Sequence, residues 1–138
     1  MKKGVIYLRE STEKQAELFL EKHLFECLDF ASKSDIEIVG HYKDIKPIKE
    51  GVEREGYEKM LSDAKNGEWE YIISATMGMM EKEYFAFTEI RDMLKEHSVT
   101  LLFTNGESPE FSSDIEIVMD MTKGLTLPEG DEDGEYFD

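Results

Sequence analysis

The fold is decided by the stretch GVIYLRESTEKQ, residues 4–15, where an apolar run changes directly into a helical pattern. Residues 4–8 are apolar and include the β-branched and aromatic types that favour strands. From residue 13 onward, apolar side chains recur every three or four positions, as on a helix with one buried face. The stretch therefore predicts a strand followed at once by a helix, with Arg9, Ser11 and Thr12 at the junction.

The same alternation continues along the chain. Strands are predicted at residues 4–8, 36–42, 70–74 and 99–104, and helices at residues 13–33, 53–66, 82–96 and 114–123. Strands separated by helices of this length favour right-handed crossovers and a parallel sheet that is covered on both faces. We therefore expect a three-layer α/β fold with a mainly parallel sheet.

Composition indicates a single folded unit. The chain has 138 residues, of which 40% are apolar, and this is enough for one domain with a buried core. We expect that domain at residues 1–127, followed by an acidic and flexible tail at residues 128–138. No apolar run is long enough to cross a membrane, and the N-terminus lacks a signal-peptide pattern. The sequence therefore predicts a cytoplasmic protein.

The charge balance bears on nucleic-acid binding. Sixteen basic residues stand against 32 acidic ones, which gives a formal net charge of −16. A surface of this sign repels the phosphates of DNA and RNA. We expect the chain to bind DNA only where a basic domain is supplied elsewhere.

Metal and redox chemistry find little support in the sequence. Cys27 is the single cysteine, and the histidines His23, His41 and His97 do not group with it at any ligand spacing. We therefore predict no metal site and no cofactor. Cys27 lies on the apolar stripe of the first helix and is expected to be a core residue.

The candidate site follows from the predicted topology. Ligands of open parallel sheets meet the carboxyl ends of the strands, where Arg9, Ser11, Asp44 and residues 75–78 are expected. Ser11 has two interpretations. In the first interpretation, Thr12 and Gln15 fit a capping box, and the hydroxyls of Ser11 and Thr12 cap the helix without any chemical role. Alternatively, Ser11 lies at a helix N-terminus beside a guanidinium, a setting that suits an anion and a nucleophile. Spacing alone does not separate these interpretations.

Other catalytic signatures are absent from the sequence. It has no Gly-Lys-Ser/Thr phosphate loop, no Gly-x-Gly-x-x-Gly after the first strand and no Gly-x-Ser-x-Gly elbow. Asp44 after the second strand suggests a phosphoacceptor receiver. The acidic pair that such a domain needs after its first strand is replaced by Arg9, Glu10 and Ser11, which argues against it.

The segment YLRESTEKQ resembles the Tyr-x-Arg-x-Ser-Thr-x-x-Gln signature of serine recombinases, the resolvase–invertase family. The segments GHYKDI and EREGYEKMLSDAKNGEWEYIISATMGMMEKE are similar to later parts of that family, so the resemblance spans residues 3–107. It implies that Ser11 matches the nucleophile that attacks a DNA phosphodiester and forms a 5′-phosphoserine link. It also implies that Arg9 and Arg54 surround the scissile phosphate, with Gln15 and Asp44 as supporting polar residues.

The sequence departs from the family after the third strand. The family carries Asp-Arg-x-x-Arg there, whereas this chain has Met77-Gly78-Met79-Met80-Glu81. The aspartate and both arginines are missing, and one arginine position holds an acid. The family also continues into a long interface helix and a basic DNA-binding region, whereas Gly124 and Pro128 interrupt the helical pattern here.

Three functional hypotheses follow from these patterns. The first is a resolvase-like domain with a degenerate active site, which acts through a protein partner or self-association in a mobile-element or prophage setting. The second is the catalytic domain of a divergent but active serine recombinase. The third is an acidic protein that mimics DNA or regulates a DNA-binding partner.

Overall fold

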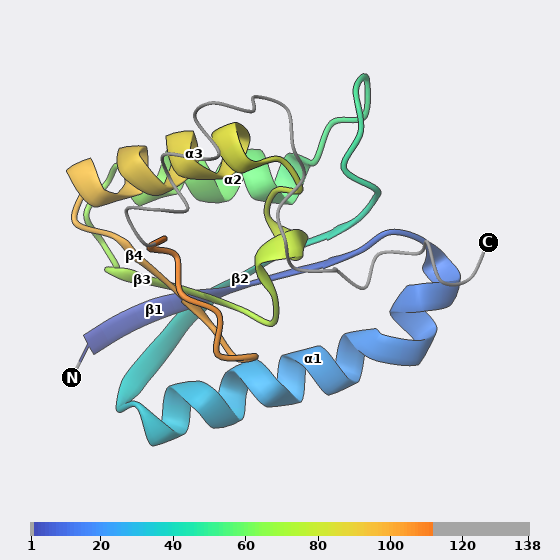
Figure 1. The fold of residues 1–138 in the computed structure, drawn as a ribbon. Helices are drawn as coiled ribbons and strands as arrows, with labels where there is room; N and C mark the ends of the chain where they lie inside the picture. Colours follow the sequence, from blue (N-terminus) through green and yellow to red (C-terminus); the bar gives the residue numbers. More distant parts are fainter. Residues whose placement is uncertain (1, 112–138) are drawn as a thin grey trace.

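The structure, a computed structural model, describes residues 2–111 (Figure 1). The helix predicted at residues 114–123 and the acidic tail predicted at residues 128–138 lie outside the described residues. The four strands are β1 (Lys2–Glu10), β2 (Ile36–Ile45), β3 (Tyr71–Ser74) and β4 (Thr100–Phe103). The helices are α1 (Glu13–Lys33), α2 (Glu55–Ala64) and α3 (Tyr84–Glu96), with a short 3₁₀ helix, η1 (Met77–Met79).

The four strands form one parallel sheet in the order β2-β1-β3-β4. Helix α1 covers one face of this sheet, and α2 and α3 cover the other (Figure 1). The predicted three-layer α/β fold with a parallel sheet is therefore confirmed.

Alternation along β1 divides the core between the two faces. Val5 and Tyr7 pack with residues of α2 and α3, whereas Ile6 and Leu8 pack with residues of α1. Successive side chains of a strand point to opposite faces, so a central strand covered on both sides is apolar throughout. This explains why residues 4–8 form an unbroken apolar run.

The predicted core position of Cys27 is confirmed. Its side chain is buried against the α1 face of the sheet. Burial raises the pKa of the Cys27 thiol to about 12, so the group stays protonated and unreactive at neutral pH.

The structure differs from the predicted elements mainly at the carboxyl edge of the sheet. Strand β2 extends to Ile45, because Arg9 pairs with Asp44 and Glu10 pairs with Ile45 along β1. Charged residues do not carry the strand periodicity, so this extension was not predicted. The helix η1 was also not predicted, since its three residues are too few to show a pattern.

The described residues contain neither a candidate membrane span nor a candidate metal cluster. None of the helices in residues 2–111 has the length and apolar character needed to cross a membrane. Within the same part of the chain, no three histidine, cysteine, aspartate or glutamate side chains gather closely enough to hold a metal ion.

Two phenylalanines test the core assignment as a matched pair. Phe87 is fully buried between α3 and β4, whereas Phe25 on α1 is 69% exposed. We expect Phe87→Ala to lower the free energy of unfolding by about 3–5 kcal/mol, since it leaves a cavity in the core. Phe25→Ala should change it by no more than about 0.5 kcal/mol. Urea unfolding followed by circular dichroism measures both, and similar losses in the two variants would contradict the assignment.

Candidate functional site

The candidate site lies where the chain changes direction in the sheet. From β1 one connection runs to β2 at one edge, while β3 pairs with β1 on its other side (Figure 1). Ligand sites of open parallel sheets form at such switch points, beyond the carboxyl ends of the strands. Here the ends of β1 and β2 meet the η1 turn that follows β3.

Arg9 is the most highly connected side chain of this edge. Its Nε donates to the Met79 carbonyl oxygen at 2.9 Å, and its Nη2 donates to the Gly78 carbonyl oxygen at 2.8 Å. Its Nη1 donates to Ser11 Oγ at 3.0 Å and to the Lys46 carbonyl oxygen at 3.2 Å. Only 2% of Arg9 is exposed, so these acceptors compensate a buried charge.

The helix cap is Thr12 and not Ser11. Thr12 has an extended backbone, and its side chain accepts a hydrogen bond from the Gln15 backbone N–H at 3.2 Å. The expected role of Ser11 as a cap is therefore wrong, because the neighbouring hydroxyl occupies that position. The Ser11 hydroxyl instead faces the Arg9 guanidinium.

Gln15 completes only half of the predicted capping box. Its backbone N–H bonds to Thr12, but both polar atoms of its buried side chain have no hydrogen-bond partner within residues 2–111. Buried amides are normally satisfied, so this side chain is an exception near Ser11. No hydrogen bond joins its amide to Ser11, Arg9 or Arg54 within residues 2–111.

Asp44 acts as a bridge between β1 and α2. One carboxylate oxygen accepts hydrogen bonds from the Tyr7 hydroxyl and the Tyr57 backbone N–H, each at 2.8 Å. The other oxygen accepts from the Gly56 backbone N–H at 2.9 Å. Asp44 thus supplies the N-terminal cap of α2 from another element, since Arg54 at the cap position provides none.

Gly56 is required by this arrangement. A Cβ atom there would lie 2.5 Å from the Lys43 carbonyl oxygen, closer than real Cβ contacts allow. The absence of a side chain lets the first turn of α2 approach the end of β2.

Arg54 lies on the same rim but forms no hydrogen bond with Ser11 among the described residues. Its Nη1 lies 3.3 Å from the Met79 carbonyl oxygen and 3.4 Å from the Tyr7 hydroxyl. Its guanidinium stacks on the ring of Tyr57, with 3.8 Å between its central carbon and the ring centroid. Arg9 and Arg54 are therefore joined through one shared acceptor, the carbonyl of Met79.

Glu81 forms an ion pair with Arg54 at this site. Its carboxylate accepts from Arg54 Nη2 at 3.2 Å, and its side chain is 16% exposed. Burial raises the pKa of the Glu81 carboxyl, and the Arg54 guanidinium only partly offsets that increase. Burial and the nearby Glu81 also raise the pKa of the Tyr57 hydroxyl, which therefore remains protonated at neutral pH.

Two groups of this edge were missed by the sequence analysis. Tyr7 was interpreted as a packing residue, yet its hydroxyl connects Asp44 with Arg54. Its spacing of two from Arg9, which places both side chains on one face of β1, was the available signal. Glu10 and His23 form a second buried pair on the opposite face, with 2.8 Å between Oε2 and Nδ1. Glu10 lies on the same face of β1 as Ile6 and Leu8, so the alternation along the strand already indicated a position against α1.

The raised pKa of Glu81 generates a prediction about stability. A carboxyl whose pKa rises on folding stabilises the fold fully at low pH, and that contribution is lost as the pH climbs through the raised value. We expect Glu81→Gln to lack this loss. The stability of Glu81→Gln relative to the unmodified chain should therefore increase above pH 4.5, the ordinary pKa of the group. Urea unfolding at a series of pH values measures this difference. A difference that shrinks with rising pH would show that the attraction to Arg54 outweighs burial and lowers the pKa of Glu81.

Several solved structures that resemble this chain are named as recombinases or as catalytic domains of recombinases and integrases. A resolvase family site-specific recombinase from Streptococcus pneumoniae has 21% sequence identity and a TM-score of 0.72, with 88% of this chain and 85% of that chain covered. The C-terminal catalytic domain of ISC1926 TnpA, an IS607-like serine recombinase, has 20% identity, a TM-score of 0.65 and coverage of 86% and 77%. The N-terminal catalytic domain of TP901-1 integrase has 13% identity, a TM-score of 0.64 and coverage of 87% and 90%.

At these identities the structural likeness shows the fold alone. Comparison of the sequence with curated proteins gave no match. The family assignment rests on the sequence itself, since residues 4–131 match the family described as Resolvase, N terminal domain. The chain therefore belongs to the resolvase N-terminal domain family, the catalytic domain of serine recombinases.

Proposed function

We propose that this domain has lost the DNA-cleaving activity of serine recombinases and acts through contacts with another protein or with a second copy of itself. The setting that suits such a domain is a mobile element or prophage, where it modulates an active recombinase in the cytoplasm. The observation that carries the proposal is the use of Arg9 and Arg54 by acceptors inside the protein.

Cleavage by a serine hydroxyl makes two demands on a site. The hydroxyl needs a group that takes its proton, and the phosphodiester needs cations that stabilise its developing charge. By family resemblance, Ser11 would be the nucleophile, Arg9 and Arg54 the phosphate ligands, and Gln15 and Asp44 the supporting residues.

The cations of this site are already compensated. Arg9 donates to the carbonyl oxygens of Gly78 and Met79, and Arg54 donates to Met79 and to the Glu81 carboxylate. A phosphate that approached Arg54 would have to displace an internal carboxylate of the same sign. The Arg54–Glu81 pair is formally neutral, so it offers little net attraction to a phosphodiester.

The Ser11 hydroxyl also lacks an evident base. Its hydrogen-bond partner among residues 2–111 is Arg9, which donates to it. Asp44 is engaged by Tyr7 and the start of α2, and His23 is paired with Glu10 on the other face. A hydroxyl held by a cation and without a base remains a weak nucleophile.

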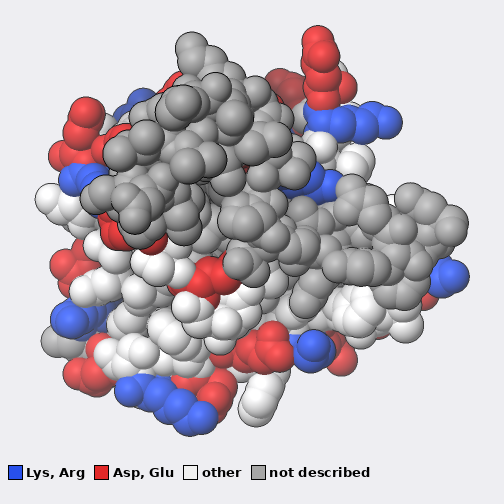
Figure 2. Space-filling model, viewed as in Figure 1, with Lys and Arg blue, Asp and Glu red and all other residues white. Residues whose placement is uncertain are grey.

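The surface charge supports a protein partner over DNA. On the face shown in Figure 2, acidic side chains are interspersed with lysines and arginines around the described part. The whole chain carries a net charge of −16. Phosphate neutralisation by Lys and Arg supplies nearly all non-specific DNA affinity, and this surface opposes it.

Two alternatives remain as proposals of lower weight. A divergent active recombinase is favoured by the contact between Arg9 and Ser11 and by the buried, unpartnered side-chain amide of Gln15. An acidic DNA mimic or regulatory binding protein is favoured by the net charge. The active-recombinase alternative differs from the main proposal in the first experiment, where it requires a Ser11-dependent adduct.

The first experiment tests covalent chemistry. The domain is joined to the DNA-binding region of an active family member and mixed with the crossover site of that member. We expect no protein–DNA adduct on denaturing gels, because phosphate charge is not neutralised and Ser11 is not activated. The triple variant Met77→Asp, Gly78→Arg, Glu81→Arg rebuilds the missing family residues and should recover adduct.

Two controls make that result interpretable. The triple variant combined with Ser11→Ala should form no adduct, which identifies the attacking hydroxyl. An adduct from the otherwise unmodified domain that disappears in Ser11→Ala would overturn the proposal and establish the active-recombinase alternative.

The second experiment tests DNA affinity of the chain itself. We expect a dissociation constant weaker than about 100 μM for duplex DNA at physiological salt, because no basic tract releases counterions. Fluorescence anisotropy of a labelled duplex measures this. Micromolar or tighter binding would contradict the prediction.

A further inference from the structure

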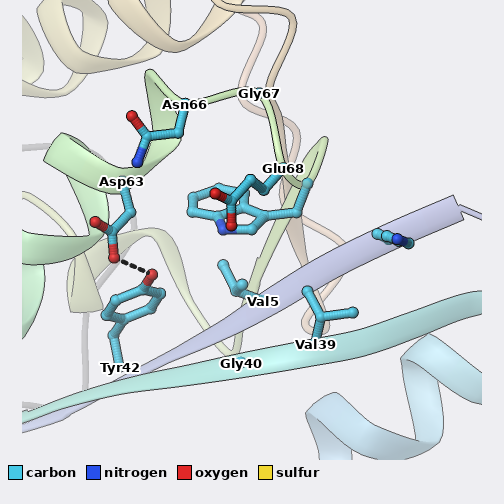
Figure 3. A pocket seen from close by; sticks show the side chains of 10 residues that line it. Val5, Val39, Gly40, Tyr42, Asp63, Asn66, Gly67 and Glu68 are labelled. Carbon is cyan, nitrogen blue, oxygen red and sulfur yellow. Dashed lines mark hydrogen bonds between the residues drawn. The ribbon is translucent and has the colours of Figure 1, made fainter.

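A cavity lies away from Ser11, on the α2 side of the sheet. It has a volume of about 670 Å³ and lies between β2 and the turn that joins α2 to β3. The aromatic rings of Tyr42 and Trp69 line it, together with the side chains of Asp63, Asn66 and Glu68 (Figure 3). It therefore combines aromatic surface with carboxylates.

A β-bulge forms the floor of this cavity. Gly4 pairs with Ile38 and Val5 pairs with Gly40, so Val39 is an extra residue on β2. A Cβ atom on Gly40 would meet Val5 at 3.5 Å, an ordinary contact, so a side chain would fit there. The cavity is open at this point because residue 40 has no side chain. Bulges often re-aim residues beside binding sites.

The aromatic wall is held in place by hydrogen bonding. The rings of Tyr42 and Trp69 have centroids 6.3 Å apart, and the Tyr42 hydroxyl donates to Asp63 Oδ2 at 2.7 Å (Figure 3). Burial, and then the bond to Asp63, raise the pKa of Tyr42 to about 12. Tyr42 therefore stays neutral and keeps Asp63 beside the rings.

The charges of the cavity favour a cationic ligand. Asp63 also pairs with Lys59 at 3.4 Å, whereas Glu68 is exposed and has no ion pair or hydrogen bond with any described residue. Lys3 is the single basic residue of the lining, and it is exposed near the N-terminal end of β1. An anion would meet two carboxylates here, and the surrounding chain carries a net charge of −16.

We propose that this cavity binds the guanidinium group of an arginine side chain presented by a partner protein. Guanidinium stacks on aromatic faces and bonds to carboxylates in a fixed planar geometry, so it matches both kinds of wall. Tyr42 supplies a partly exposed ring, Trp69 forms the more deeply buried part of the aromatic wall, and Glu68 supplies the carboxylate that is not yet engaged. The proposal concerns a different surface from Ser11 and holds whether or not that serine is active.

The chain is well suited to a direct test, because Trp69 is its single tryptophan. Its fluorescence and its indole N–H resonance in NMR spectra therefore report on this cavity alone. The probe is the peptide acetyl-Gly-Arg-Gly-amide, and its matched control has citrulline, a neutral isostere, in place of arginine. We expect saturable changes at Trp69 with the arginine peptide and none with the citrulline peptide.

Two variants separate a site from general charge attraction. Glu68→Gln should weaken the arginine peptide about fivefold, as expected for loss of one exposed charge pair. Glu89→Gln removes an equal charge from an exposed position on α3 and should leave binding unchanged. Equal weakening by both variants, absence of saturation, or equal binding of a lysine or citrulline peptide would overturn the proposal.

Discussion

The buried guanidinium of Arg9 is the constraint on which this edge of the molecule depends. A buried charge is tolerated only when hydrogen bonds and opposing dipoles replace its water. Arg9 meets that demand with the carbonyl oxygens of Gly78, Met79 and Lys46. Those carbonyls belong to the η1 turn and to the segment after β2, so one side chain of β1 fixes the positions of two other segments.

The same arrangement underlies the proposed loss of cleavage chemistry. In a recombinase site, guanidinium groups must be available to an incoming phosphodiester. Here the η1 turn contributes carbonyls and Glu81, and both arginines point into that turn. In the proposed account, the absence of the Asp-Arg-x-x-Arg pattern does more than remove two cations, because residues 78–81 accept hydrogen bonds from Arg9 and Arg54. This is the physical basis for proposing a domain that works through protein contacts.

The fold was predictable because the pattern of apolar residues in each segment indicates which of its faces are buried. Residues 4–8 read as a strand buried on both faces, and the stripe that contains Cys27 read as the inner face of α1. The placement of Arg9, Ser11 and Asp44 at one edge followed from parallel topology alone. The family resemblance followed from the first motif and its spacing to the later segments, and the match over residues 4–131 confirms it.

Other features were beyond sequence reasoning because they depend on three-dimensional neighbours. Thr12 was predicted as a cap from its spacing to Gln15, but the contact between the Ser11 hydroxyl and the Arg9 guanidinium depends on side-chain geometry that spacing does not show. The η1 carbonyl oxygens that accept hydrogen bonds from Arg9 belong to the main chain, so the residue types at these positions do not predict the contact. The cavity beside Trp69 requires a bulge in β2, which appears only when two strands are paired.

The availability of the two arginines can be measured directly by titrating the protein with dimethyl phosphate, a minimal phosphodiester. The Nε–H resonances of Arg9 and Arg54 in ¹H–¹⁵N NMR spectra report on each guanidinium, and single Arg→Lys variants assign them. If both cations are used internally, neither resonance should respond to dimethyl phosphate beyond the effect of an equal concentration of chloride. Saturable shifts of both resonances at one common affinity would show an open phosphate site and would contradict the account.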